Sequence, residues 1–240
     1  MPSVARRALA EFIGTALLLL AVVGSGIAAR RLSPGDTGLE LLENAIATGA
    51  ALAAIIGCLG PVSGSHLNPA VSLVDAALGG LRGRHLPAYL AAQFLGAVTG
   101  VVVANLMFSL PAVTISARAR SGGGLWLGEA VATFGLLLVI FGLMRSHRPS
   151  AVPVAVGAYI TGAYFFTSST SFANPAVAVA RMFSNTFAGI SPGSVAPFVA
   201  AELVGAAIAF LAIRVLHPPE REAAPVRVLA GGDARTETTA

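Results

Sequence analysis

The stretch SFANPAVAVAR, Ser171–Arg181, places an asparagine–proline pair inside an apolar run. Asparagine is a good N-cap for a helix, and proline is favoured in the first helical turn, where its missing N–H would have had no partner. Only about ten helix-forming residues follow, which at 1.5 Å per residue cover about half of a bilayer. The stretch therefore predicts a half-length helix that begins at Asn174.

A second copy of this pattern lies in the first half of the chain. HLNPAVSL begins at His66, and the segment Asn68–Leu78 is again about half a membrane long. Small polar residues precede each copy, and such non-helical backbone is tolerated at membrane depth only beside a water-filled cavity or inside protein. Two copies in equivalent settings argue against two unrelated helix caps. The motif residues are Asn68, Pro69, Ala70, Asn174, Pro175 and Ala176.

The composition indicates that a lipid bilayer surrounds the chain. Of 240 residues, 55% are hydrophobic and 11% are charged, against about 25% charged in soluble domains. Six apolar runs approach the ~20 residues that a spanning helix needs, so both ends lie on one side. The runs are 8–29, 39–59, 86–110, 125–144, 151–167 and 195–216. The first run is too long for a signal peptide and lacks a clear cleavage site.

The arginines predict which side the termini occupy. With both termini in the cytoplasm, most arginines face inward, as the positive-inside rule expects. Those facing inward would be Arg6, Arg7, Arg82, Arg84, Arg145, Arg148, Arg214 and Arg221, and those facing outward Arg30, Arg31, Arg118 and Arg120. The net positive charge thus reflects topology, and no basic stripe or aromatic platform indicates nucleic-acid binding.

The remaining composition points to neither an enzyme nor a metal site. The four histidines are scattered, and no spacing of Cys, His and carboxylates suggests a metal, so we expect no cofactor. Cys58, the lone cysteine, is expected to be a small packed residue. The polar tail, 217–240, is expected to be disordered in the cytoplasm.

The two halves of the chain repeat one another. AEFIGT from Ala10 parallels GEAVAT from Gly128, and AAQFLGA from Ala91 parallels AAELVGA from Ala200. Each half holds three spans, an odd number, so the second half must enter the bilayer from the opposite face. The sequence predicts an inverted repeat, about 8–110 and 125–216, within a single channel domain, 1–216. Such repeats place the functional path near the midplane.

The inverted repeat brings the two half-helices together at their N-termini. The positive ends of both helix dipoles then face one midplane point and repel cations and protons. Asn68 and Asn174 can each donate an amide N–H to a passing oxygen, which orients a water and breaks a proton-conducting chain. Carbonyl groups of the preceding loops would offer acceptors; these belong to Gly64, Ser65, His66, Ser169, Thr170 and Ser171. These features together predict a pore that passes neutral solutes and resists charged ones.

Two acidic residues occupy equivalent places in spans one and four. Glu11 and Glu129 are expected to be structural, each accepting backbone N–H bonds from a re-entrant loop, because a bare carboxylate at this depth is costly. Gln93 and Glu202 form another matched pair with an expected structural role.

The paired NPA motifs and the AEFIGT opening resemble the aquaporin (major intrinsic protein) family over Ala8–Leu216. The resemblance implies an all-α membrane fold of six transmembrane helices and two re-entrant half-helices. It also implies a homotetramer with one pore per subunit, passing small neutral solutes across a lipid bilayer. The glutamates would brace the loops.

The resemblance also locates a selectivity filter. Most family members carry an arginine three residues after the second motif asparagine, whereas this chain has Val177. The family's intervals place Thr48, Gly162 and Ser171 on the other walls, with Tyr164 instead of Gly162 if a loop is two residues shorter.

This wide, uncharged ring would suit water together with polyols, urea or metalloid hydroxides such as arsenous acid. The chain resembles the branch of bacterial aquaporins found with arsenic-resistance systems, which implies the bacterial inner membrane. The alternatives are a strict water channel and, in another class, a coupled secondary transporter.

Arg181 follows Val177 by four residues, about 6 Å farther along the helix. We expect a structural ion pair with Glu40 or Glu43, near the outer end of span two. The functional alternative is that Arg181 draws anions or hydrogen-bond acceptors into the outer vestibule. Either glutamate could otherwise be solvated or pair with another outer arginine.

Overall fold

The computed structural model describes residues 2–218, and their regular structure is entirely helical. Six helices are long and apolar enough to cross a membrane. They are α1 (Val4–Leu32), α2 (Thr37–Ser63), α4 (Leu86–Met107, preceded by η1, Gly83–His85), α5 (Gly123–Arg145), α6 (Val152–Phe166, preceded by η2, Pro149–Ala151) and α8 (Pro192–Leu216). Each overlaps most of one of the six apolar runs, so the predicted fold class is confirmed. The tail expected from 217 onward lies outside the described residues beyond 218.

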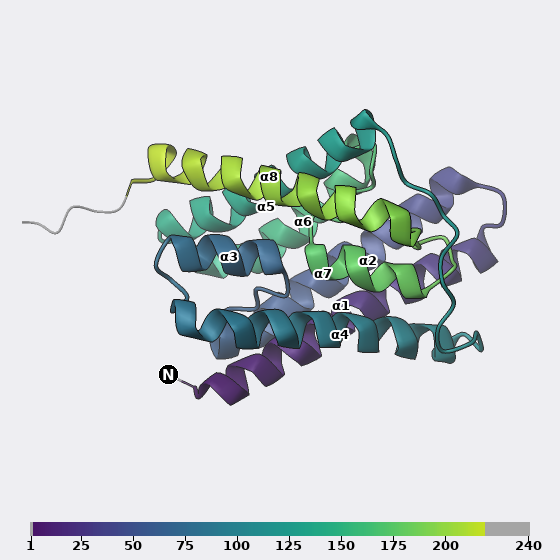
Figure 1. The fold of residues 1–240 in the computed structure, drawn as a ribbon, viewed down its shortest axis with the longest axis horizontal. Helices are drawn as coiled ribbons and strands as arrows, with labels where there is room; N and C mark the ends of the chain where they lie inside the picture. Colours follow the sequence, from purple (N-terminus) through teal and green to yellow (C-terminus); the bar gives the residue numbers. More distant parts are fainter. Residues whose placement is uncertain (1, 219–240) are drawn as a thin grey trace, which may run out of the picture.

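Two short helices complete the fold between the long ones. α3 (Pro69–Ala77) and α7 (Pro175–Ala180, continued by η3, Arg181–Phe183) each begin at the proline that follows a motif asparagine. In Figure 1 α3 and α7 lie on either side of the centre of the bundle and run in opposite directions. They are the re-entrant half-helices that the sequence predicts.

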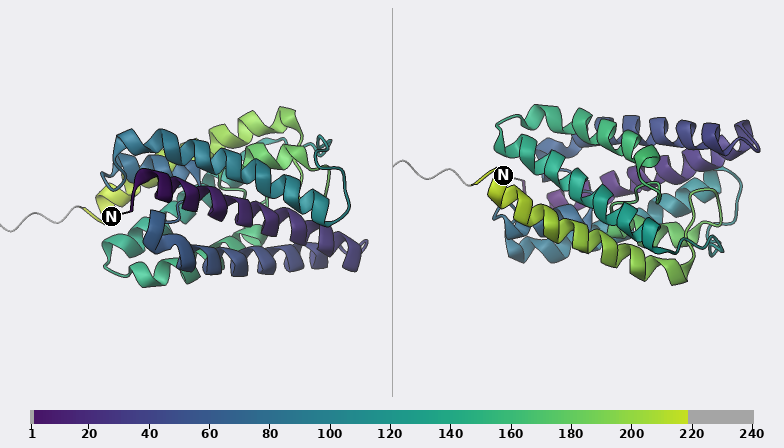
Figure 2. Two further views of the ribbon diagram at one scale, coloured as in Figure 1. Left: turned by 90° about the horizontal axis from the view of Figure 1, so that it is seen from below. Right: turned by 90° about the horizontal axis from the view of Figure 1, so that it is seen from above.

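Each half of the chain packs in the same way. α1 lies against α4 and α2, while α5 lies against α8 and α6, as the two views of Figure 2 show. Helix α2 also packs against α6 and joins the halves. The N-terminus and the last described residues lie at the same end of the bundle (Figures 1 and 2), as an even number of crossings requires.

Glycines allow the long helices to approach closely. A Cβ on Gly96 or Gly100 of α4 would lie 2.3 or 2.2 Å from a backbone oxygen of α1, and one on Gly205 of α8 would lie 2.2 Å from the Ala130 oxygen of α5. Small residues at helix contacts drive packing in lipid, where the hydrophobic effect between helices is absent. The equivalent contacts recur in both halves.

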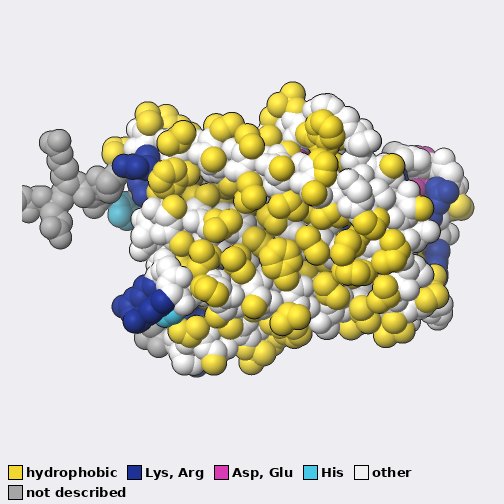
Figure 3. All heavy atoms as spheres, in the orientation of Figure 1, with side chains coloured by type: hydrophobic (Ala, Val, Ile, Leu, Met, Phe, Trp, Pro, Cys, Tyr) yellow, Lys and Arg dark blue, Asp and Glu magenta, His cyan; other side chains and the backbone are white. Residues whose placement is uncertain are grey.

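The outer surface matches a lipid environment. Hydrophobic side chains cover the middle of the face shown in Figure 3, and basic side chains gather toward the two ends. Cys58 is exposed on α2, so the expectation that it is packed inside the protein is wrong. Its side chain is small and apolar enough to face lipid.

Candidate functional site

The two motif asparagines meet at the centre of the molecule. Asn68 Nδ2 donates to the Ala173 carbonyl oxygen at 2.7 Å, and Asn174 Nδ2 donates to the Leu67 carbonyl oxygen at 2.8 Å. Each asparagine also caps its own half-helix, since its Oδ1 accepts the backbone N–H two residues ahead. This reciprocal pair of bonds joins the loops and leaves each amide one further N–H.

The loops before the half-helices share an unusual backbone. Ser65 and Leu67 have φ of 47° and 52°, and their counterparts Ser171 and Ala173 have φ of 50° and 48°. Non-glycine residues adopt this left-handed region at a cost of order 1 kcal/mol or more, and it persists where the surroundings enforce it. The matching angles mean that both loops turn their carbonyl groups in the same alternating way.

Two buried carboxylates hold the loops in this conformation. Glu11 accepts N–H bonds from His66 at 3.0 Å and Leu67 at 2.7 Å. Glu129 does the same for Phe172 at 2.9 Å and Ala173 at 2.7 Å. Both glutamates therefore hold the loops in place from positions outside the cavity lining.

Gln93 and Glu202 support the loops from the third helix of each half. Gln93 Nε2 donates to Glu11 at 2.9 Å and to the Ser72 hydroxyl at 2.9 Å. Glu202 accepts the Asn174 backbone N–H at 3.0 Å. These contacts are the ones that the expected structural role requires.

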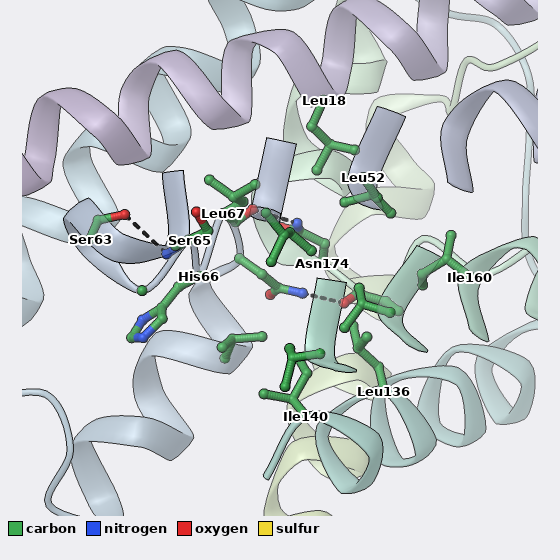
Figure 4. Close-up of a pocket in the computed structure, with 18 of the residues that line it drawn as sticks. Leu18, Leu52, Ser63, Ser65, His66, Leu67, Leu136, Ile140, Ile160 and Asn174 are labelled. Atoms are coloured by element: carbon green, nitrogen blue, oxygen red, sulfur yellow. Dashed lines mark hydrogen bonds between the residues drawn. The ribbon is translucent and has the colours of Figure 1, made fainter. Parts of the chain in front are cut away.

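A cavity of about 420 Å³ runs past the paired asparagines. Its lining extends from Pro2, Arg7 and Gly80 at one end to Tyr164 and Arg181 at the other. One wall consists of the loop residues 63–68 and 171–174, and it carries the polar groups around the motif asparagines. The opposite wall is aliphatic; it includes Leu18, Leu52, Leu136, Ile140 and Ile160, which surround Leu67 and Asn174 in Figure 4.

Of the four residues expected in the filter, three line this cavity. Thr48, Ser171 and Val177 all line it. Gly162 does not line it, because it lies on the exposed side of α6. Tyr164 occupies the position instead, and its hydroxyl is 3.2 Å from Thr48 Oγ1. Two residues turn a helix through about 200°, so the alternative count gives the correct face.

Arg181 forms no ion pair with Glu40 or Glu43, so that expectation is wrong. Glu40 pairs with Arg30 at 2.7 Å, and Glu43 accepts a bond from the Ser33 hydroxyl. Arg181 is buried and lines the cavity, with its Nε donating to the Ala188 carbonyl oxygen. Its guanidinium instead stacks on the Phe172 ring.

Two features of the lining have little signal in the sequence. His66 lines the end of the cavity near Arg7, where its Nε2 lies 3.3 Å from Asp75 and its Nδ1 3.0 Å from Ser72. His66 and Ser72 are six residues apart in the sequence. This spacing predicts a contact only where the start of α3 lies against the loop that precedes it. The sequence does not reveal which residues form the aliphatic wall, because the helices that contribute to it are apolar on every side. Within residues 2–218 no cluster of three or more Cys, His or acidic residues could hold a metal.

Fold and site together define a six-span membrane protein whose two half-helices meet beside a central cavity. The chain belongs to the major intrinsic protein family, whose model matches residues 1–171. It is 54% identical over 216 residues to aquaglyceroporin AqpS of Rhizobium meliloti (strain 1021), covering 90% of this chain and 92% of that protein.

More distant relatives support the same assignment. Aquaporin AqpM of Methanothermobacter marburgensis is 29% identical over 243 residues, covering 90% of this chain and 99% of that protein. The crystal structure of the aquaglyceroporin from Plasmodium falciparum matches with a TM-score of 0.69 at 24% identity, covering 88% of this chain and 96% of that one. This structural match concerns the fold.

Proposed function

We propose that the protein is a passive channel for small uncharged solutes, which passes water together with larger polar molecules such as glycerol or arsenous acid. The observation that carries this proposal is the uncharged ring of Thr48, Tyr164, Ser171 and Val177 on a cavity that continues past both motif asparagines. A relative 54% identical to this chain is an aquaglyceroporin by name, in keeping with a solute larger than water.

The composition of the ring favours a broad range of solutes. Val177 brings neither charge nor length to the place where most family members have an arginine. Thr48 and Tyr164 supply hydroxyl groups, which can replace part of the hydration that a polyol or a metalloid hydroxide loses on entry. The aliphatic wall lies opposite and can contact the carbon atoms of such a solute. The hydroxyl side and the carbon side of the solute then each contact a surface of similar polarity.

Proton exclusion rests on the asparagine pair. One N–H of each amide is already bonded to the opposite loop, and the second N–H is left to hold the oxygen of a passing solute. Two helix N-termini contribute positive potential at the same point. A water held in this way donates its hydrogens away from the centre, which interrupts a proton-conducting chain.

The contacts argue against the coupled transporter. Glu11, Glu129 and Glu202 accept bonds from loop N–H groups and lie outside the cavity lining. A carboxylate that binds a coupling ion needs access to the solute path. Flux that collapses with the proton gradient would nevertheless contradict the proposal.

Replacing Val177 with arginine tests the width of the ring. In vesicles containing purified protein, we expect Val177→Arg to lower glycerol flux at least about tenfold and to change water flux less than about threefold. The long charged side chain would fill the ring and bind solute oxygens tightly. Stopped-flow light scattering measures both fluxes.

Val177→Met is the control for that experiment, since methionine adds similar length without charge. We expect it to narrow the ring and reduce glycerol flux less than arginine does. If wild type and Val177→Arg pass glycerol equally well, Val177 is not part of the filter. If wild type passes water but no glycerol, the protein is a strict water channel.

The assembly and setting belong to the same proposal. We propose a homotetramer in the bacterial inner membrane with both termini in the cytoplasm and one channel domain over residues 1–216. The exposed apolar side chains on the long helices, among them Leu95, Leu106, Val204 and Leu211, supply surface for lipid and for neighbouring subunits.

A further inference from the structure

Arg181 is a buried cation that the ring of four residues does not include. It lies at the junction of α7 and η3, one helical turn beyond Val177. Its side chain is 2% exposed, yet it lines the cavity at the end occupied by Tyr164. The guanidinium therefore borders the solute path beside the ring.

Two contacts fix the orientation of this guanidinium. Its Nε donates to the Ala188 carbonyl oxygen, and its central carbon lies 3.5 Å from the centroid of the Phe172 ring. Phe172 is itself held edge-on against Phe198, with the ring centroids 5.2 Å apart. The ring of Phe172 covers one face of the guanidinium, and Nε is already hydrogen-bonded. The two terminal nitrogens, Nη1 and Nη2, therefore remain as donors.

Within residues 2–218 no protein group accepts a hydrogen bond from these two nitrogens. Nor does any carboxylate in that part of the chain lie within 4.0 Å of them. A buried charge is costly unless it is paired or hydrogen-bonded. Oxygen atoms inside the cavity are the remaining partners for these N–H groups.

The surroundings add positive charge at the same end. The Arg120 guanidinium lies 5.1 Å from the same Phe172 ring and donates to the Gly189 and Phe187 carbonyl oxygens. Burial, and then the charges of Arg181 and Arg118, lower the pKa of Arg120 to about 9, so it is charged at neutral pH. Like charges of this density repel cations and favour oxygen-bearing ligands.

We propose that Arg181 forms a binding subsite for pairs of adjacent oxygen atoms and so determines specificity for small vicinal polyols and oxyacids. Nη1 and Nη2 donate to two neighbouring oxygens of the solute, the geometry in which a guanidinium binds best. A solute of equal size whose oxygens are farther apart makes one of these bonds and enters more slowly. This inference rests on the proposed function, since it assumes that solutes larger than water pass.

The isomers 1,2-propanediol and 1,3-propanediol test this subsite, because they share a formula and differ in whether the oxygens are adjacent. Flux of each isomer, of glycerol and of water is measured by stopped-flow light scattering, with the flux through empty vesicles subtracted. We expect wild type to prefer the 1,2 isomer. Arg181→Met should bring the ratio of the two isomers to about one and lower glycerol flux about fivefold, while water flux changes less than about twofold.

Arg120→Met is the matched control, because both arginines lie over Phe172 and only Arg181 lines the cavity. We expect this control to keep the wild-type isomer ratio. Arg181→Lys retains the charge and loses the pair of terminal nitrogens, so it should retain exclusion of cations and lose the isomer preference. Water flux reports in every variant that the channel has folded.

Three outcomes would overturn the inference. An unchanged isomer ratio in Arg181→Met would remove the subsite and leave the proposed function intact. Parallel loss of water and glycerol flux in both methionine variants would assign Arg181 a structural role. Wild-type vesicles that pass no polyol would overturn the proposed function, and the subsite with it.

Discussion

Glu129 and Glu202 are both fully buried beside the second motif loop, where each accepts backbone N–H bonds, and Glu202 Oε2 has no hydrogen-bond partner on the protein within residues 2–218. In the first half the equivalent pair is Glu11 and Gln93, in which the amide donates to the carboxylate. Glutamine in place of Glu202 would therefore repeat the arrangement of the first half.

We expect Glu202→Gln to be tolerated. The amide oxygen can accept the Asn174 N–H and the amide N–H can donate to Glu129, so thermal unfolding in detergent should shift by less than about 0.5 kcal/mol in free energy. Solute flux should remain within about twofold of wild type.

Glu202→Leu is the contrasting variant, because it removes the acceptor of the Asn174 N–H and leaves that N–H buried without a partner. We expect a loss of about 1–3 kcal/mol in stability and a lower flux. Equal stability of the leucine and glutamine variants would show that Glu202 does not support the loop.

At the scale of the elements, half-helix starts were predictable and helix faces were not. Asn68 and Asn174 begin their helices through local bonds to nearby N–H groups, and such bonds depend on neighbouring residues alone. The face that α6 turns inward depends on packing against α2, where Gly49 and Gly157 bring the two helices together. That contact decides between Gly162 and Tyr164.

The close crossing of α1 and α4 gives a prediction at the same scale. A Cβ on Gly100 would lie 2.2 Å from the Ala16 carbonyl oxygen, so the helices must separate. We expect Gly100→Ala to destabilise the protein by about 1–3 kcal/mol, measured by thermal unfolding in detergent.

Gly57→Ala serves as the control for that substitution. Gly57 is also helical, but the nearest atom to an added Cβ is 3.9 Å away. Alanine has the higher helix propensity, so this variant should unfold at the wild-type temperature or slightly above. A Gly100→Ala variant as stable as Gly57→Ala would contradict the proposed tight crossing.

At the scale of the whole molecule, the six spans set the topology. The link between α1 and α2 and the link between α5 and α6 lie at opposite ends of the bundle, since three spans, α2, α4 and α5, lie between them. Basic residues gather toward both ends (Figure 3). The arginine asymmetry predicts which end faces the cytoplasm.

Single-cysteine variants test this orientation. In a Cys58→Ser background, we expect Pro34→Cys to react with a membrane-impermeant maleimide applied to intact cells, and Ser150→Cys to react after lysis. Both positions are exposed in the links between spans, so access to the reagent depends on the side of the membrane. The reverse labelling pattern would place the termini outside.

The sequence by itself determined the six spans, the inverted repeat and the start of each half-helix. These features follow from run length, span parity and local capping chemistry, all of which act over a few neighbouring residues. The hydrogen bonds of Glu11 and Glu129 to the loops also followed, because a buried carboxylate must find N–H donors and the unpaired loops supply them.

Only the tertiary structure decided which side chains face the cavity and where Arg181 binds. Helices immersed in lipid are apolar on both the lipid side and the protein side, so periodicity does not reveal the inward face. Arg181 lies on Phe172 and the Ala188 carbonyl group, contacts that exist only after η3 has turned back against the second motif loop. Both features depend on packing between residues that are far apart in the sequence, which local sequence patterns do not reveal.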